Sequence, residues 1–94
     1  MKVQKNDILL IDRFEFAKLA AKRCLGYGSS SIELSGETYV KEVRGDKIMI
    51  IDECGVFRTW VDVDDIARIG GKVVGYLNGR NWLTGGLRRV YKQR

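Results

Sequence analysis

The residues with the clearest chemistry lie in the last twenty-four positions, where lysines and arginines are interleaved with tyrosine and tryptophan. Cations neutralise phosphates and release their counterions, while flat rings and arginine planes stack on unpaired bases. A surface that binds single-stranded nucleic acid needs this combination of cations and aromatic rings. The candidate nucleic-acid-binding residues are Lys72, Tyr76, Arg80, Trp82, Arg88, Arg89, Tyr91, Lys92 and Arg94. The same pattern also fits a solvated hairpin whose rings pack into the core.

The charge of the chain is divided unevenly between two segments. Residues 1–70 hold eleven lysines and arginines against all twelve acids, a net charge of −1, whereas residues 71–94 hold six cations and no acid. The whole excess of +5 therefore comes from the C-terminal segment. A local excess of this kind favours anionic partners. An acidic protein surface fits it as well as a nucleic acid does.

Two other kinds of chemistry have less support in the sequence. Asp62, Asp64 and Asp65 gather three carboxylates, but they lack the fixed spacing and the distal glutamate of a calcium-binding EF-hand. We interpret Asp64 as the cap of a tight turn and predict no metal site. The chain contains no histidine, the most common general base near neutral pH. We therefore expect no catalytic residues, no cofactor and no enzyme activity.

The N-terminal part of the chain predicts a strand followed by a helix. Residues 7–12 form a short apolar run that is typical of a buried strand. Asp12 and Glu15 have the spacing of a capping box, in which carboxylates satisfy the free N–H groups at a helix start. Apolar residues then recur at helical spacing over residues 13–24. The glycines and serines of residues 26–31 indicate a loop.

The middle of the chain predicts a three-stranded meander. Side chains alternate between two faces from residue 37 to residue 52, with a turn at residues 44–46 that divides the segment into a hairpin. A second turn at residues 53–55 leads into another alternating run, residues 56–62. These three strands are expected to pair in sequence order.

The C-terminal part predicts a turn, a short strand and a hairpin. Residues 63–66 interrupt the alternation as a single tight turn would, and residues 67–69 are expected to form a short closing strand. Within residues 72–83, the Asn78-Gly79 pair suits the positive φ angles of a two-residue hairpin loop. One further apolar and basic run covers residues 87–92.

The middle of the chain resembles the small SH3-like, KOW-type proteins common in bacteriophage genomes. The resemblance is carried by residues 36–43, 45–55 and 60–66. Shared features are a glycine-led strand, a Gly-Asp turn, a strand that ends in an acidic turn with glycine, and a final aspartate-rich turn. The resemblance covers about residues 7–69. It implies a small barrel that serves as a platform for nucleic acid or protein partners, and it implies a bacteriophage origin.

The expected fold is therefore mainly β, as one domain over residues 1–94. It consists of an SH3-like barrel core over residues 7–69, with a short helix inserted after the first strand, and of a basic hairpin and strand extension over residues 70–94. The chain has no long apolar run and no apolar leader. We thus expect a cytoplasmic protein, in the host cell if phage-encoded, without a membrane partner.

Two functions follow from these expectations. The first is a non-enzymatic accessory or regulatory protein that binds RNA or single-stranded DNA through the basic, aromatic C-terminal segment. The alternative is a small phage-type inhibitor or adaptor that docks on an acidic surface of a host protein through the same cations or through an exposed edge strand. The protein is expected to be a monomer or a weak homodimer.

Overall fold

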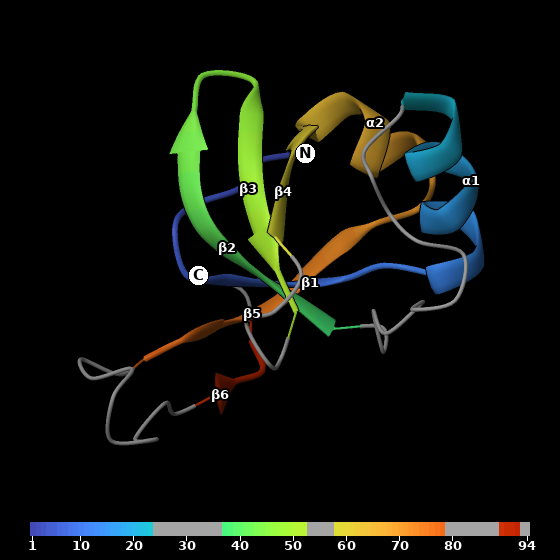
Figure 1. The fold of residues 1–94 in the computed structure, drawn as a ribbon. Coiled ribbons are helices and arrows are strands. Elements are labelled where there is room, and N and C mark those ends of the chain that lie inside the picture. Colours follow the sequence, from blue (N-terminus) through green and yellow to red (C-terminus); the bar gives the residue numbers. More distant parts are fainter. Residues whose placement is uncertain (24–36, 53–57, 79–88, 93–94) are drawn as a thin grey trace.

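The computed structural model describes residues 1–23, 37–52, 58–78 and 89–92, which form a six-stranded antiparallel sheet and two short helices (Figure 1). The strands are β1 (Asp7–Leu10), β2 (Glu37–Arg44), β3 (Lys47–Ile51), β4 (Arg58–Asp62), β5 (Lys72–Leu77) and β6 (Arg89–Val90). The helices are α1 (Arg13–Arg23) and α2 (Val63–Arg68). The prediction of a mainly-β protein is confirmed. None of the described helices is long and apolar enough to cross a membrane.

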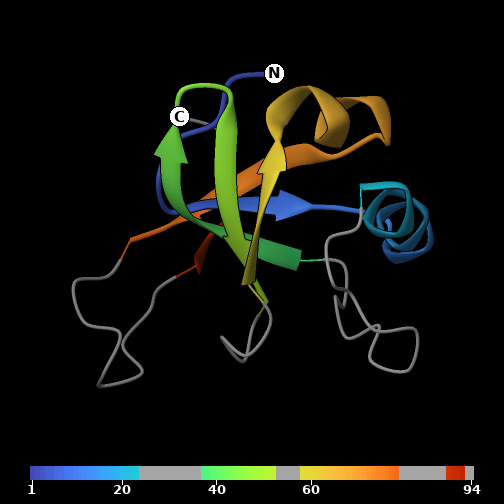
Figure 2. The same ribbon diagram turned by 45° about the horizontal axis from the view of Figure 1, so that its top comes forward.

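The strand order is β4-β3-β2-β1-β5-β6, with β1 between β2 and β5. A barrel closes only when the two end strands of its sheet pair with each other. Within the described residues β4 pairs with β3 and β6 pairs with β5, so this sheet is open and the predicted closed barrel is not formed. In Figures 1 and 2 the β2–β3–β4 meander runs across the direction of β1 and β5.

Two irregularities in the ladders bend the sheet. The pairing of β2 with β3 shifts its register between Val40 and Glu42, and the pairing of β1 with β5 shifts between Ile8 and Leu9. Such bulges bend a strand and increase its local twist. The long strand β2 can therefore pair with β1 along its first half and with β3 over most of its length.

The hairpin between β2 and β3 has the turn that the sequence predicted. Arg44 pairs with Lys47, which leaves Gly45 and Asp46 as a two-residue loop. Gly45 has a φ of 58°, the left-handed value that the first position of a type II′ turn requires. The turn predicted at residues 53–55 lies outside the described residues.

Helix α1 begins where the capping signal predicted. The Asp12 Oδ1 atom accepts hydrogen bonds from the backbone N–H groups of Phe14 at 2.8 Å and Glu15 at 3.1 Å. Phe16, Leu19 and Ala20 form the buried side of the helix, and Figure 1 shows α1 beside the sheet. The described part of α1 ends at Arg23, one residue before the predicted end.

Helix α2 corrects two predictions. The turn expected at residues 63–66 continues for one more turn of helix, so the closing strand expected at residues 67–69 does not form. Burial explains the difference, because Ile66 is fully buried and the helical path carries it into the core. The helix ends at Arg68 with Ile69 as its C-cap residue, and Gly70 follows with a φ of 82° that suits glycine. A segment of six residues is too short for helical periodicity to be recognised in its sequence.

The two faces of the sheet carry separate hydrophobic clusters. We call the first the helix-covered face, because α1 and α2 contribute to its cluster. Its buried members are Leu9, Ile11, Phe16, Leu19, Ala20, Val40, Ile48, Ile50, Val61 and Ile66. The opposite face buries a smaller cluster of Ile8, Tyr39, Ile51 and Leu77. Adjacent residues such as Ile8 and Leu9 belong to different clusters, as the alternation of a strand requires.

Candidate nucleic-acid interface

Five of the nine predicted binding residues belong to the described parts of the chain. These residues are Lys72, Tyr76, Arg89, Tyr91 and Lys92. The remaining candidates, Arg80, Trp82, Arg88 and Arg94, lie outside the described residues. The described five are divided between strand β5 and the segment that contains β6.

Strand β6 lies along the outer edge of β5. Leu77 pairs with Arg89, and Tyr76 pairs with Val90 on one side and with Asp7 of β1 on the other. Both edges of β5 are therefore occupied at Tyr76. A two-residue turn at Asn78-Gly79 would pair Leu77 with residue 80. In the structure Leu77 pairs with Arg89 of β6.

The close approach of β6 depends on Gly75. A Cβ atom at this position would collide with the carbonyl oxygen of Val90 and would lie 2.8 Å from the Cα atom of Tyr91. A side chain of any size is thus incompatible with the observed path of the backbone after β6. Gly75 has this role because a neighbouring backbone passes directly over it.

Arg89 is held against β2 by a tyrosine. Its Nε atom donates a hydrogen bond to the Tyr39 hydroxyl at 2.9 Å, and its guanidinium carbon lies 5.8 Å from the centre of the Tyr39 ring. The Tyr39 ring is almost fully buried, with 3% exposure, whereas Arg89 is exposed. The contact therefore fixes the position of a cation that solvent and ligands can still reach.

Tyr91 reaches the same strand with its hydroxyl group. The Tyr91 hydroxyl donates a hydrogen bond to the Glu37 carboxylate at 3.1 Å, while 57% of the residue stays exposed. Partial burial raises the pKa of Tyr91, and the hydrogen bond to Glu37 and the negative charge of Glu37 raise it further. The protonated phenol is thus the bound form. Lys92 follows Tyr91 and is also exposed.

Tyr76 and Lys72 lie apart from this group. Leu77 shares its cluster with Tyr39, so the preceding residue Tyr76 faces the other side of the sheet and is half-buried. Lys72 is exposed at the far end of β5, where it pairs with Leu10. The structure therefore brings together Arg89, Tyr91 and Lys92, and it separates Tyr76 and Lys72 from them.

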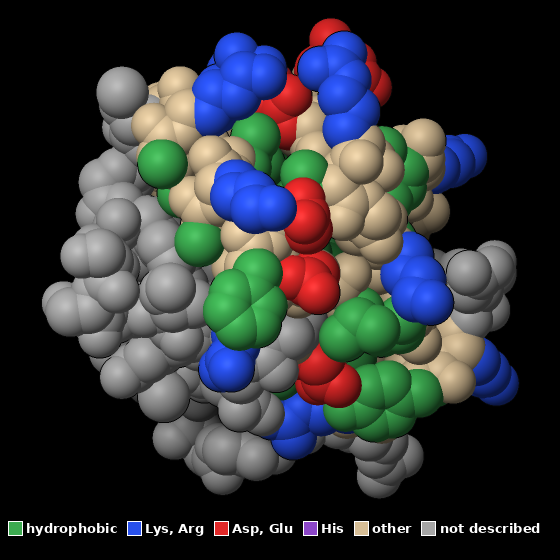
Figure 3. All heavy atoms as spheres, turned by 90° about the vertical axis from the view of Figure 1, so that its right-hand side faces the viewer, with side chains coloured by type: hydrophobic (Ala, Val, Ile, Leu, Met, Phe, Trp, Pro, Cys, Tyr) green, Lys and Arg blue, Asp and Glu red, His purple; other side chains and the backbone are tan. Residues whose placement is uncertain are grey.

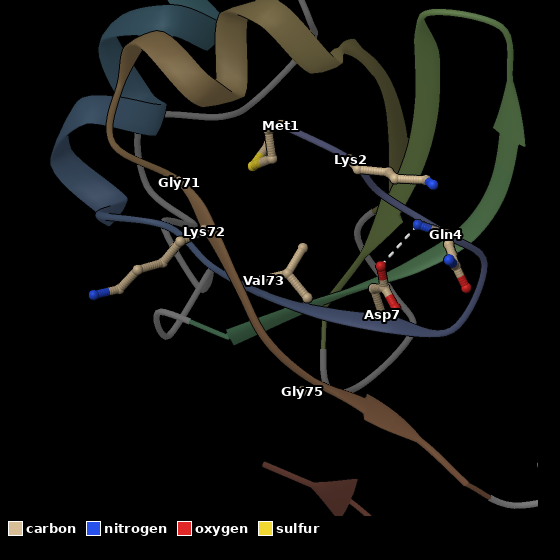
Figure 4. A pocket seen from close by; sticks show the side chains of 8 residues that line it. All are labelled: Met1, Lys2, Gln4, Asp7, Gly71, Lys72, Val73 and Gly75. Atoms are coloured by element: carbon tan, nitrogen blue, oxygen red, sulfur yellow. Dashed lines mark hydrogen bonds between the residues drawn. The ribbon is translucent and has the colours of Figure 1, made fainter. Parts of the chain in front are cut away.

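A hollow of about 470 Å³ lies between β5 and the residues that precede β1 (Figure 4). The side chains of Met1 and Val73 point into it, whereas Lys72 points away from its middle. At one end the buried Asp7 carboxylate accepts a hydrogen bond from the backbone N–H of Gln4 at 2.7 Å. The hollow therefore combines apolar walls with an acid, and Lys72 does not bring its charge into it.

The acidic turn that the sequence singled out is occupied by ion pairs. Asp65 is buried, and both of its carboxylate oxygens accept hydrogen bonds from Arg23 at 3.1 Å. These hydrogen bonds and the charge of Asp65 raise the pKa of Arg23. Asp62 is the N-cap residue of α2 and pairs with Lys47 at 3.1 Å. Asp64 is thus not the cap, because it lies inside the first turn of the helix.

The sequence did not indicate the two residues that hold Arg89 and Tyr91, and it did not single out the aromatic residue on β4 as a candidate. The sequence places Glu37 and Tyr39 in a predicted strand and gives no sign that they anchor Tyr91 and Arg89. Trp60 on β4 is half-buried, and the guanidinium carbon of Arg44 lies 5.0 Å from its ring. The available signal was the alternation of Arg58 and Trp60, which places both side chains on one face of a strand.

Comparisons of this chain with protein-family models, with curated proteins and with solved structures found no match.

Proposed function

We propose that this protein binds single-stranded nucleic acid, either RNA or DNA, and acts as a non-enzymatic accessory or regulatory protein. The observation that carries the proposal is the grouping of Arg89, Tyr91 and Lys92 beside β2. Arg89 and Lys92 are exposed cations, and Tyr91 between them is 57% exposed. Phosphates require such cations, and an unpaired base stacks on such a ring.

The binding mechanism is electrostatic capture followed by stacking. Arg89 and Lys92 neutralise phosphates, and Tyr91 offers a face of its ring to a base. Tyr39 holds the Arg89 guanidinium in place before the ligand arrives, so less side-chain entropy is lost when the contact forms. Glu37 restrains the Tyr91 ring through the hydroxyl group in the same way.

The fold supports this assignment through its strand order. The first strand, the β2–β3–β4 meander, the short helix α2 and a last strand that pairs with β1 follow one another as in the SH3-like, KOW-type proteins that the sequence resembles, although the last strand is β5, beyond residues 7–69. We propose a distant SH3-like relationship on this basis, and the sequence resemblance alone is the ground for proposing a bacteriophage origin. Such a fold provides a platform, and the side chains on it decide the ligand.

The helical side of the protein offers a contrast. In Figure 3, which shows the face that carries α1, acidic side chains form a central band with lysines and arginines around it. Lys18 on this face already pairs with Glu15 at 3.3 Å. Mixed charges attract phosphates less than the acid-free C-terminal segment does, so lysines of α1 are suitable control positions.

The proposal is tested with a fluorescent oligonucleotide of about 12 nucleotides, whose anisotropy is measured over a series of salt concentrations. The double variant Arg89→Ala, Lys92→Ala is expected to lower the slope of log K against log salt by about 1 to 2 units, at about 0.7 per phosphate contact. The control variant Lys18→Ala, Lys22→Ala removes the same charge from α1. The proposal would be contradicted if the two variants had equal slopes of log K against log salt. Wild-type affinity that does not change with salt concentration would also contradict it.

A second candidate is an inhibitor or adaptor that docks on an acidic protein surface. The observation in its favour is that β4 ends the sheet and pairs only with β3 within the described residues. An end strand can accept an additional strand from a partner. A pull-down from bacterial lysate with and without nuclease separates the two functions, because only a protein partner is retained after nuclease treatment.

A further inference from the structure

The β2–β3–β4 meander places a second aromatic and basic group at the other end of the sheet from β6. Glu42, Met49 and Trp60 pair across the three strands, so their side chains form one row on one face. Arg44 and Lys47 pair in the row beyond them. We call Trp60, Met49, Arg44, Lys47 and Arg58 the Trp60 platform.

The Trp60 platform is more open than the rest of its face. The neighbouring row contains Tyr39, Ile51 and Arg58, of which Tyr39 and Ile51 are buried in the small cluster. In contrast, Met49 and Trp60 are only half-buried, and Arg58 is exposed. The platform therefore presents apolar and aromatic surface where the hydrophobic cluster of this face ends.

Arg44 extends the aromatic surface of Trp60. Its guanidinium carbon lies 5.0 Å from the centre of the Trp60 ring, and 71% of its side chain is exposed. A guanidinium is flat and stacks on nucleobases as well as on aromatic rings. Trp60 and Arg44 can thus stack with a base together, or the base can replace Arg44 on the ring.

The cationic side chains of the platform can exchange their carboxylate partners for phosphates with little loss of folding stability. Arg44 pairs with Glu42 at 3.2 Å and Lys47 pairs with Asp62 at 3.1 Å, and all four side chains are at least 43% exposed. Exposed ion pairs of this kind contribute little to stability. A phosphate can therefore exchange with either carboxylate without a large loss of folding free energy.

We infer that the Trp60 platform is a second stacking site for single-stranded nucleic acid. A base stacks on Trp60 and Arg44, and the flanking phosphates contact Lys47 and Arg58. The inference rests on the proposed function for its class of ligand, but it uses residues on β2, β3 and β4 and none from β6. The protein measures 35 Å along its longest axis, so one oligonucleotide of about 12 nucleotides can reach both ends of the sheet.

Tryptophan fluorescence tests the inference without changing the platform. The chain contains two tryptophans, so the variant Trp82→Phe, which keeps an aromatic ring at a candidate binding position, leaves Trp60 as the sole tryptophan. Addition of the oligonucleotide is expected to quench Trp60 in this variant, because stacked bases quench an indole. An oligonucleotide with abasic sites is the control for charge alone, and it should bind with much less quenching. Binding without any difference in quenching between the two oligonucleotides would overturn the inference.

A second measurement assigns the affinity to residues. Arg58→Ala in the Trp82→Phe background is expected to weaken binding several-fold and to reduce the quenching, whereas Arg68→Ala on α2 should change neither. Unchanged affinity and quenching in Arg58→Ala would count against the platform. Loss of binding in the double variant Arg89→Ala, Lys92→Ala, together with no quenching of Trp60 when the Trp82→Phe protein binds the oligonucleotide, would retain the proposed function and reject the platform. Quenching that survives this double variant would retain the platform and reject β6 as the principal site.

Discussion

One face of the sheet packs against α1 and α2 and buries ten hydrophobic residues in one cluster, whereas the opposite face buries four. The helix-covered face is held by interdigitated apolar side chains. On the opposite face, Tyr39 and Glu37 hold Arg89 and Tyr91 through hydrogen bonds, and these two residues stay exposed. The comparison indicates that folding stability comes mainly from the first face, while the second leaves a cation and an aromatic ring exposed to solvent.

The largest effect is expected from a change on the helix-covered face. Phe16 is fully buried on α1, so Phe16→Ala should lower the free energy of unfolding by about 3 to 5 kcal/mol through lost burial and a new cavity. Urea denaturation followed by circular dichroism measures this loss. The control is Phe14→Ala in the same helix, where the ring is 63% exposed and the change should cost no more than about 0.5 kcal/mol. A loss for Phe16→Ala as small as the loss for Phe14→Ala would mean that α1 contributes little to the core.

An intermediate effect is expected at the contact between β5 and β6. Gly75→Ala forces β6 away from β5, because the new Cβ atom collides with Val90, and this should cost about 1 to 3 kcal/mol. The same displacement should weaken oligonucleotide binding through Arg89 and Tyr91. Denaturation and anisotropy measure the two effects.

A second glycine provides the matched control for this change. Gly45 has a φ of 58° in the β2–β3 turn but has open space around it, so Gly45→Ala introduces strain of about 1 kcal/mol and leaves β6 in place. Oligonucleotide affinity should therefore fall only in Gly75→Ala. A similar fall in both variants would attribute the effect to general destabilisation.

The smallest effect concerns the pH dependence of the Tyr91–Glu37 hydrogen bond. Because the folded state raises the pKa of Tyr91 above its ordinary value, this contribution to stability is complete below the ordinary value. It is lost as the pH rises through the raised pKa. The stability difference between wild type and Tyr91→Phe should thus shrink in strongly alkaline solution.

Phenolate absorbance provides the direct measurement of this pKa. The titration of wild type minus that of Tyr91→Phe should have its midpoint above the ordinary tyrosine value of about 10. Glu37→Gln should move the midpoint towards that value, since it removes the charge that opposes ionisation. A midpoint at or below the ordinary value would show that Tyr91 does not donate to Glu37 in solution.

The parts of the fold that the sequence predicted depend on contacts between near neighbours. Asp12 caps α1 through N–H groups two and three residues away, and Gly45 with Asp46 turns the chain between paired neighbours. Residue type and spacing are sufficient for such features because the chain needs no distant partner to form them. The difference in net charge between residues 1–70 and 71–94 is also predictable from the sequence, since it follows from composition alone.

The tertiary structure decided which of the candidate residues meet. Arg89 and Tyr39 are separated by 50 positions, and Tyr91 and Glu37 by 54, so their contacts exist only because β6 docks on β5 beside the β1–β2 ladder. Burial of Ile66 likewise extends the turn predicted at residues 63–66 into α2, in place of the strand predicted at residues 67–69. The sequence by itself determined the mainly-β class and the basic C-terminal segment. The pairing of distant strands determined the faces on which its cations and rings lie, because local patterns do not encode which strands become neighbours.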